Sequence, residues 1–202
     1  HPAYFISSVI GIAAVDSGLG LWEGLKPDLE KAITICEDLG NNRQTGESLA
    51  FLTCNASIMG DTQATFAYNQ RLDESARRRQ NPVQVVWVKQ LESYILVRQG
   101  ELERAVTLAD ESIAIMEGGL TAEISDYVVR SVRANALWEL GRYEESWAAV
   151  KKLLDKLAKA SVVDYSIYQA HSQLTEILIH ALERARTHGI AKTEQDEVEK
   201  YA

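Results

Sequence analysis

The stretch Gly141–Ser146, which reads GRYEES, decides how this chain folds, because the same kind of turn recurs upstream. A similar stretch is Gly100–Ala105 (GELERA), and fainter versions begin at Gly60 and Gly20. The four glycines are spaced by 40, 40 and 41 residues. A constant period of this length is typical of a solenoid of stacked helical hairpins, in which each hairpin covers the apolar face of its neighbour.

Three columns of residues appear when the four units are superposed on their turn glycines. Seven positions before the glycine stand Ala13, Thr53, Ser93 and Ala134. Five positions after it stand Leu25, Thr65, Ala105 and Ser146, of which only leucine is bulky. Two positions after it stand Trp22, Thr62, Leu102 and Tyr143. The small residues predict close approach of the two helices of a hairpin, and the bulky ones fill the gaps between hairpins.

Composition points to an ordinary soluble protein rather than a disordered or membrane one, since 46% of the residues are hydrophobic and 25% are charged. The net charge of −8 disfavours a nucleic-acid partner, which requires a basic surface. Cys36 and Cys54 form no CxxC pair and cannot staple a secreted scaffold. We therefore expect a cytoplasmic protein that works neither on nucleic acid nor at a membrane.

The first helix is predicted over Ala3–Ser17. A signal peptide or a membrane span is the alternative interpretation of this apolar run, but it lacks a basic leader, contains Asp16, and is shorter than about 20 apolar residues. Its apolar residues fall on most sides, so several faces must be covered. We expect that the parent protein continues upstream of His1, or that a partner docks on this helix.

Eight further helices are predicted from periodicity and capping signals, and Pro27 is tolerable only in the first turn of the second helix. The expected ranges are 22–39, 46–59, 61–79 and 82–99 for the second to fifth helices, 122–140 for the seventh and 162–188 for the ninth. The sixth is expected to follow the turn at Gly100 and stop at Gly118-Gly119, and the eighth to follow the turn at Gly141 and run through Lys159. Thr121 is expected to cap the seventh, and Ser161–Asp164 to form a capping box for the ninth. The domain organisation is one solenoid over residues 1–188, followed by a polar tail over 189–202.

The triplet Arg77-Arg78-Arg79 ends the fourth predicted helix. Such a cluster could form an anion-binding patch. A simpler interpretation is that three cations in the last turn complement the negative end of the helix dipole and lie on a solvated face.

The Gly-x-[Tyr/Leu/Trp]-x-x-[small] pattern of the turns resembles the tetratricopeptide repeat, and the resemblance covers the chain from about Ala3 to Arg186. It implies an all-α superhelix of about four antiparallel hairpins plus a long C-terminal helix. The chain departs from that family in two ways: the period is 40 instead of 34, and the proline that usually closes a repeat is missing. Longer helices account for the extra residues of the period. HEAT and armadillo repeats share the period but lack the glycine-led turn.

More narrowly, Ala32–Gln44 and the segment Ala158–Glu176 look like longer-period repeats of multidomain signalling proteins. In such proteins the repeats accompany a signal-transduction ATPase module, often with a class III nucleotide cyclase domain. The resemblance implies a regulatory or scaffolding fragment of a larger protein.

The sequence contains no strong motif for catalysis, nucleotide binding or metal binding. There is no GxxxxGK[ST] phosphate loop, and His171 and His180 are nine residues apart, which places them on opposite faces of a helix. We expect no catalytic residues, no cofactor and no metal site. An enzyme would require an unforeseen cluster of carboxylates or histidines.

In tetratricopeptide stacks the first helix of each hairpin lines a concave groove. Carrying that register over selects a candidate protein-binding set: Trp87, Gln90, Tyr94, Arg98, Asn135, Trp138 and Glu139. Aromatic and arginine side chains are the usual anchors of interfaces, although Trp87 and Trp138 serve equally well as core between repeats. The leading hypothesis is a non-catalytic scaffold that binds a protein, a peptide or neighbouring domains of its own chain. The alternative is a sensor that holds a small molecule in the groove.

Overall fold

The computed structural model describes residues 2–159 and 167–188, and every element within these ranges is an α-helix. The helices are α1 (Pro2–Leu19), α2 (Leu25–Asp38), α3 (Asn42–Ile58), α4 (Thr62–Arg79), α5 (Pro82–Gln99), α6 (Leu102–Glu117), α7 (Glu123–Glu139), α8 (Tyr143–Leu157) and α9 (Ile167–His188). The all-α prediction is confirmed. The expected tail over 189–202 and the expected capping box at Ser161–Asp164 lie outside the described residues.

The four turn glycines each end the first helix of a hairpin in the left-handed conformation. Gly20, Gly60, Gly100 and Gly141 have φ between 75° and 78°. A side chain would be strained there, which is why glycine recurs at this position. The hairpins are therefore α1/α2, α3/α4, α5/α6 and α7/α8, as the turn pattern predicts.

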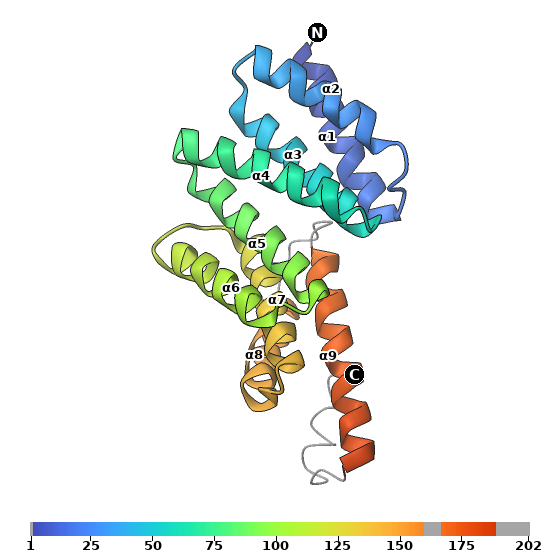
Figure 1. The fold of residues 1–202 in the computed structure, drawn as a ribbon, viewed down its shortest axis with the longest axis vertical. Helices are drawn as coiled ribbons and strands as arrows, with labels where there is room; N and C mark the ends of the chain where they lie inside the picture. Colours follow the sequence, from blue (N-terminus) through green and yellow to red (C-terminus); the bar gives the residue numbers. More distant parts are fainter. Residues whose placement is uncertain (1, 160–166, 189–202) are drawn as a thin grey trace.

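The odd-numbered and even-numbered helices form two layers. Each odd helix packs on the next odd helix, while the even helices make little or no contact with one another. Each even helix packs on the odd helices before and after it, except that α8 makes little contact with α9. Figure 1 shows the hairpins following one another from α1 at the top to α8 at the bottom. This is the expected α-α superhelix, a repeat-like fold compatible with the tetratricopeptide class.

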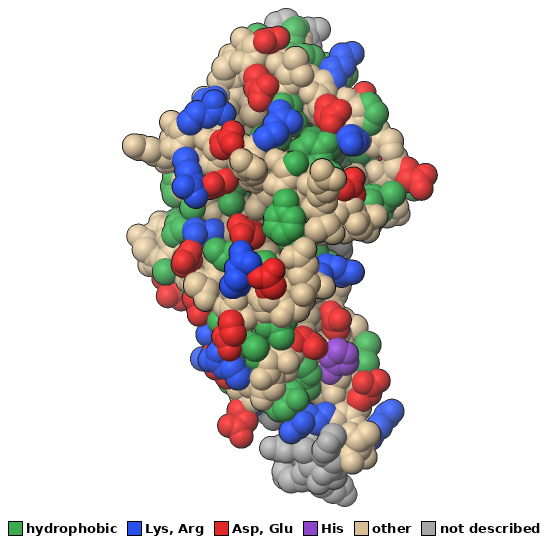
Figure 2. All heavy atoms as spheres, in the orientation of Figure 1, with side chains coloured by type: hydrophobic (Ala, Val, Ile, Leu, Met, Phe, Trp, Pro, Cys, Tyr) green, Lys and Arg blue, Asp and Glu red, His purple; other side chains and the backbone are tan. Residues whose placement is uncertain are grey.

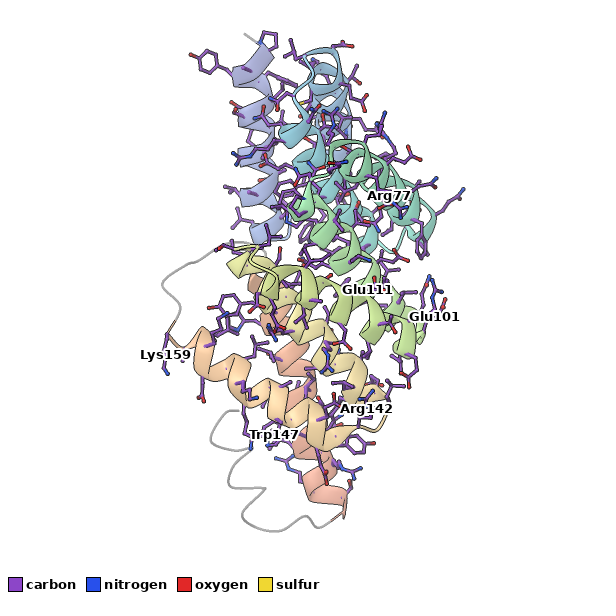
Figure 3. The ribbon with its side chains drawn as sticks, turned by 90° about the vertical axis from the view of Figure 1, so that its left-hand side faces the viewer. Arg77, Glu101, Glu111, Arg142, Trp147 and Lys159 are labelled. Carbon is purple, nitrogen blue, oxygen red and sulfur yellow. The ribbon has the colours of Figure 1, made fainter. Side chains whose placement is uncertain are left out.

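The two columns of small residues lie where the hairpins close. Ala13, Thr53, Ser93 and Ala134 are fully buried, and so are Thr65, Ala105 and Ser146 at 0 to 1% exposure. Leu25, the bulky exception, is also buried. Figure 3 shows that the turn residues Glu101 and Arg142 lie on the same side of the stack. The repeat register inferred from the sequence is therefore the register of the fold.

Asparagine and aspartate side chains set several of the helix starts. The side chains of Asn41, Asp61 and Asn81 accept backbone N–H bonds at the first turns of α3, α4 and α5. The third helix consequently begins at Asn42, four residues earlier than expected. Thr121 does not cap the seventh helix, which begins at Glu123 after Ala122.

One face of α1 is open to solvent. Tyr4, Ile12, Val15 and Leu19 recur at helical spacing and are each more than half exposed. The opposite face is buried through Ile6, Val9 and Ala13. Helix α1 is therefore apolar on several sides, as predicted. One of these sides packs on α2 and α3, and another is exposed. None of the described helices combines the length and apolar character that crossing a membrane requires.

Candidate functional site

The predicted groove residues of α5 form a single stripe. Trp87, Tyr94 and Arg98 are spaced by seven and four residues, which places them on one side of the helix. Trp87 and Tyr94 are partly exposed and Arg98 is exposed. The Arg98 guanidinium lies 6.0 Å from the centre of the Tyr94 ring. Gln90, which was predicted to belong to the same binding set, is instead buried at 8% exposure, and its amide oxygen has no hydrogen-bond partner among the described residues.

The predicted groove residues of α7 are largely covered by α9. Asn135 is 2% exposed and its amide donates to Gln173 Oε1 at 2.7 Å and to Glu176 Oε2 at 3.1 Å. Glu139 is exposed, and its carboxylate lies 3.5 Å from Nδ1 of His180. These contacts show that α9 runs parallel to α7, and Figure 1 shows the two side by side.

Trp138 is core. It is 8% exposed and packs edge-to-face on Tyr143 with ring centres 4.9 Å apart. The guanidinium of Arg184 also packs on Tyr143 and lies 3.9 Å from the centre of its ring. Of the two tryptophans that the sequence left open, Trp138 therefore belongs to the packing between helices, whereas Trp87 is partly exposed beside the core of the first hairpins.

The first turns of α9 reach a helix of the second hairpin. The Gln169 amide donates to Cys54 Sγ of α3 at 3.8 Å. Burial raises the pKa of the Cys54 thiol to about 11, an effect that the bond from Gln169 opposes only in part. A thiol in this state is a weak nucleophile. Helix α9 thus crosses from α7 toward α3 instead of simply extending the row.

Two furrows run along the outer layer, each between two even helices and floored by the odd helix between them. The α6–α8 furrow, of about 580 Å³, is lined by Asp110, Ile113, Asp126, Arg130, Arg133, Glu145, Ala148, Ala149, Lys152, Leu153 and Lys156. The α2–α4 furrow, of about 470 Å³, is lined by Glu37, Thr45, Leu49, Arg71, Glu74, Ser75, Arg78 and Arg79. Figure 2 shows acidic and basic side chains interspersed over one face of the molecule.

The cations of the α6–α8 furrow are mostly paired with its own carboxylates. Arg133 contacts Asp110 at 2.5 Å and Glu145 at 3.0 Å, and Lys156 contacts Asp126 at 2.8 Å. Burial alone would lower the pKa of Arg133, but these two carboxylates raise it overall. Arg133, followed by Arg142, holds the pKa of Glu145 below its usual value. Most of the positive charges in this furrow are therefore balanced by carboxylates that line the same furrow.

The arginines of the α2–α4 furrow are not paired with carboxylates to the same extent. Arg71 makes one loose contact with Glu37 at 3.5 Å, with both side chains about half exposed. Arg78 donates to a backbone carbonyl, that of Glu74, at 3.3 Å. Within the described residues Arg79 makes no ion pair or hydrogen bond. Sequence reasoning singled out the arginine triplet but missed Arg71 and Ser75. Arg71 lies seven and eight residues before Arg78 and Arg79, and Ser75 lies three and four before them, so helical spacing would have added both.

His171 and His180 lie on opposite faces of α9, and no group of three metal-ligating side chains converges among the described residues. Comparisons with protein-family models, with curated protein sequences and with solved structures find no match to this chain.

Proposed function

We propose that this chain is a non-catalytic helical-repeat scaffold that binds a protein segment along α5. The observation that carries the proposal is the stripe of Trp87, Tyr94 and Arg98, three side chains of the kinds that anchor interfaces, none of them fully buried. The architecture supports it, because stacked hairpins present long continuous surfaces on which an extended or helical segment can lie.

The segment bound belongs either to a separate protein or to a neighbouring domain of the same chain. The second option rests on the resemblance of Ala32–Gln44 and Ala158–Glu176 to repeats of multidomain signalling ATPases and nucleotide cyclases. In that setting the stack would transmit the state of one domain to another through contacts on α5.

Selection from a displayed library of random and helical peptides tests the proposal, with affinities of selected peptides measured by isothermal titration. We expect peptides whose binding is lost in Tyr94→Ala/Arg98→Ala. The matched control is Phe66→Ala/Arg77→Ala on α4, which removes one aromatic ring and one guanidinium from exposed positions elsewhere.

The control double variant should bind the peptides as the unaltered chain does. A selection that yields no peptide, or peptides that bind both double variants equally, would remove α5 as the binding surface. Thermal melts of the two variants show whether either has lost its fold.

A further inference from the structure

We propose that the α2–α4 furrow binds a small molecule that carries a phosphate group. This site is separate from the α5 stripe and lies in the outer layer, whereas the sensor alternative considered from sequence placed a ligand in the concave groove. Its volume of about 470 Å³ lies within the range of small-molecule sites.

The first support is the spacing of the lining residues on α4. Arg71, Ser75, Arg78 and Arg79 follow one another at four, three and one residues, so all four project from one side of the helix. Thr45 of α3 lies across from them in the same furrow. Three guanidinium groups and two hydroxyl groups line this cavity together with the carboxylates of Glu37 and Glu74, which leaves it net positive in a chain whose net charge is −8. The Thr45 hydroxyl already donates to Asn41 O at 2.9 Å, so Ser75 carries the hydroxyl that has no partner within the described part of the chain.

The second support is that the helix dipole does not require these arginines. Two of the last four carbonyls of α4 already accept from the chain itself, since Gln80 N–H donates to Arg77 O at 3.2 Å and Asn81 N–H donates to Ala76 O at 3.1 Å. Arg77 turns to Asp73, at 2.8 Å, and does not line the furrow. The triplet is therefore divided: one arginine is paired on the helix surface and two line the cavity.

The third support is an unsatisfied hydroxyl. Ser75 is 3% exposed and its Oγ has no hydrogen-bond partner among the described residues. Ser93 and Ser131, also buried in helices, each donate to a carbonyl three residues back at 2.8 Å. The buried hydroxyls of Ser48 and Ser112 lack a partner in the described ranges as well, but of these three unpaired serines only Ser75 lines the furrow. A buried polar group without a partner costs about 1–3 kcal/mol, so such a group in a cavity points to a ligand that would complete it.

The chemistry favours phosphate over carboxylate. A carboxylate fills one guanidinium fork with its two oxygens, whereas a phosphate monoester offers three oxygens to several donors at once. The loose Arg71–Glu37 contact, at 3.5 Å, leaves the Arg71 guanidinium available to a stronger anion. In the α6–α8 furrow the arginines are instead committed to Asp110, Asp126 and Glu145.

The test is a titration of the isotope-labelled chain with inorganic phosphate at constant ionic strength, followed by amide chemical shifts. We expect saturable shifts concentrated around Thr45 and Ser75. Because charged hydrogen bonds contribute about 1.5–3 kcal/mol, Arg71→Gln and Arg79→Gln should each raise Kd by about tenfold or more. Arg77→Gln on the same helix should leave Kd unchanged.

Ser75→Ala supplies a second and independent measurement. It should weaken phosphate binding several-fold, yet leave the unliganded chain as stable as before or slightly more so, because the hydroxyl has no partner to lose. A clear loss of stability would mean that Ser75 serves the fold.

Three other results would overturn the proposal: no shifts at all, shifts that spread over the lysines and arginines without saturating, or shifts retained in Arg71→Gln/Arg79→Gln. Acetate that binds as tightly as phosphate would overturn the assignment of the anion. None of these results bears on binding along α5.

Discussion

The hydroxyl of Ser146 donates to the backbone carbonyl of Ala134 at 2.7 Å, and both residues are fully buried. This hydrogen bond joins the column of small residues before the turn glycine to the column after it. It joins α7 directly to α8, and because both residues are fully buried, the two positions leave no room for a larger side chain.

Ala134→Trp should overpack this contact and lower the free energy of unfolding by about 1–3 kcal/mol or more. Ser146→Ala, which removes the hydrogen bond without adding volume, should cost about 1 kcal/mol. Glu144→Ala, at an exposed position in the first turn of α8, should be nearly neutral. Urea denaturation of the three variants measures this order, and equal midpoints would contradict the packing described for the hairpin.

Gly46 and Gln84 form a second close contact, between α3 and α5. A Cβ on Gly46 would overlap the Gln84 side-chain amide, which donates to Asn42 O at 3.1 Å. Gly46→Ala should therefore destabilise by about 1–3 kcal/mol, although alanine is the better helix former by about 1 kcal/mol.

A double-mutant cycle tests the cause of that loss. Gly46→Ala/Gln84→Ala should cost less than the sum of the two single variants, because removing the amide makes room for the new methyl group. Additive costs in chemical denaturation would show that the two positions do not compete for the same space.

The thiol of Cys54 reports on the docking of α9. In a Cys36→Ala background, a thiol reagent at pH 8 should modify Cys54 slowly, since burial raises the pKa of Cys54 to about 11. Asn135→Ala removes the bonds to Gln173 and Glu176, so it should loosen α9 and speed the modification. Release of the coloured thiolate measures the rate.

The matched control for that experiment is Asn69→Ala, which removes a buried amide between α4 and α5 without touching α9. It should change the labelling rate less than Asn135→Ala does. Equal acceleration by both variants would mean that Cys54 responds to global opening rather than to α9.

The paired carboxylate of Glu145 gives a pH dependence of defined sign. Arg133 and Arg142 hold the pKa of Glu145 below its usual value of 4.5, so its contribution to stability is present above that value and is lost as the pH falls through the lowered pKa. Because the side chain is about two-fifths exposed, the effect should stay below about 1 kcal/mol.

Glu145→Gln should therefore be slightly less stable than the unaltered chain at pH 7 and equal to it below the lowered pKa. Thermal melts across this range give the comparison. A difference that is independent of pH would assign the loss to packing instead of charge.

The sequence predicted the repeat because its signal is local. A left-handed turn at Gly100 or Gly141 excludes most side chains, and close helix contacts at Ser93 and Ala134 exclude bulk, so both constraints appear directly as residue types. Helix starts were harder. Asn41 and Thr45 both carry capping chemistry, and only the packing of α3 decides between them.

The residues of the candidate site were harder to predict than the helix starts, because the exposure of a side chain depends on which distant parts of the chain pack against it. Tyr94 and Asn135 each stand six positions before their turn glycine, yet only Asn135 is bonded to α9 and is buried, whereas Tyr94 is partly exposed. The path of α9 has no local signal, since it depends on how far the superhelix turns between α3 and α7. Whether the α5 stripe binds a partner stays a prediction.

Repeat arrays ordinarily behave as open chains of nearest neighbours, in which damage at one end stays there. The bond from Gln169 to Cys54 spans 115 positions and brings the C-terminal helix back to the second hairpin. Helix α9 thus contacts both the fourth hairpin, through α7, and the second hairpin, through Cys54 of α3. Melting should therefore be more nearly all-or-none than the hairpin count implies, and an event at the end of the chain can be felt near its beginning.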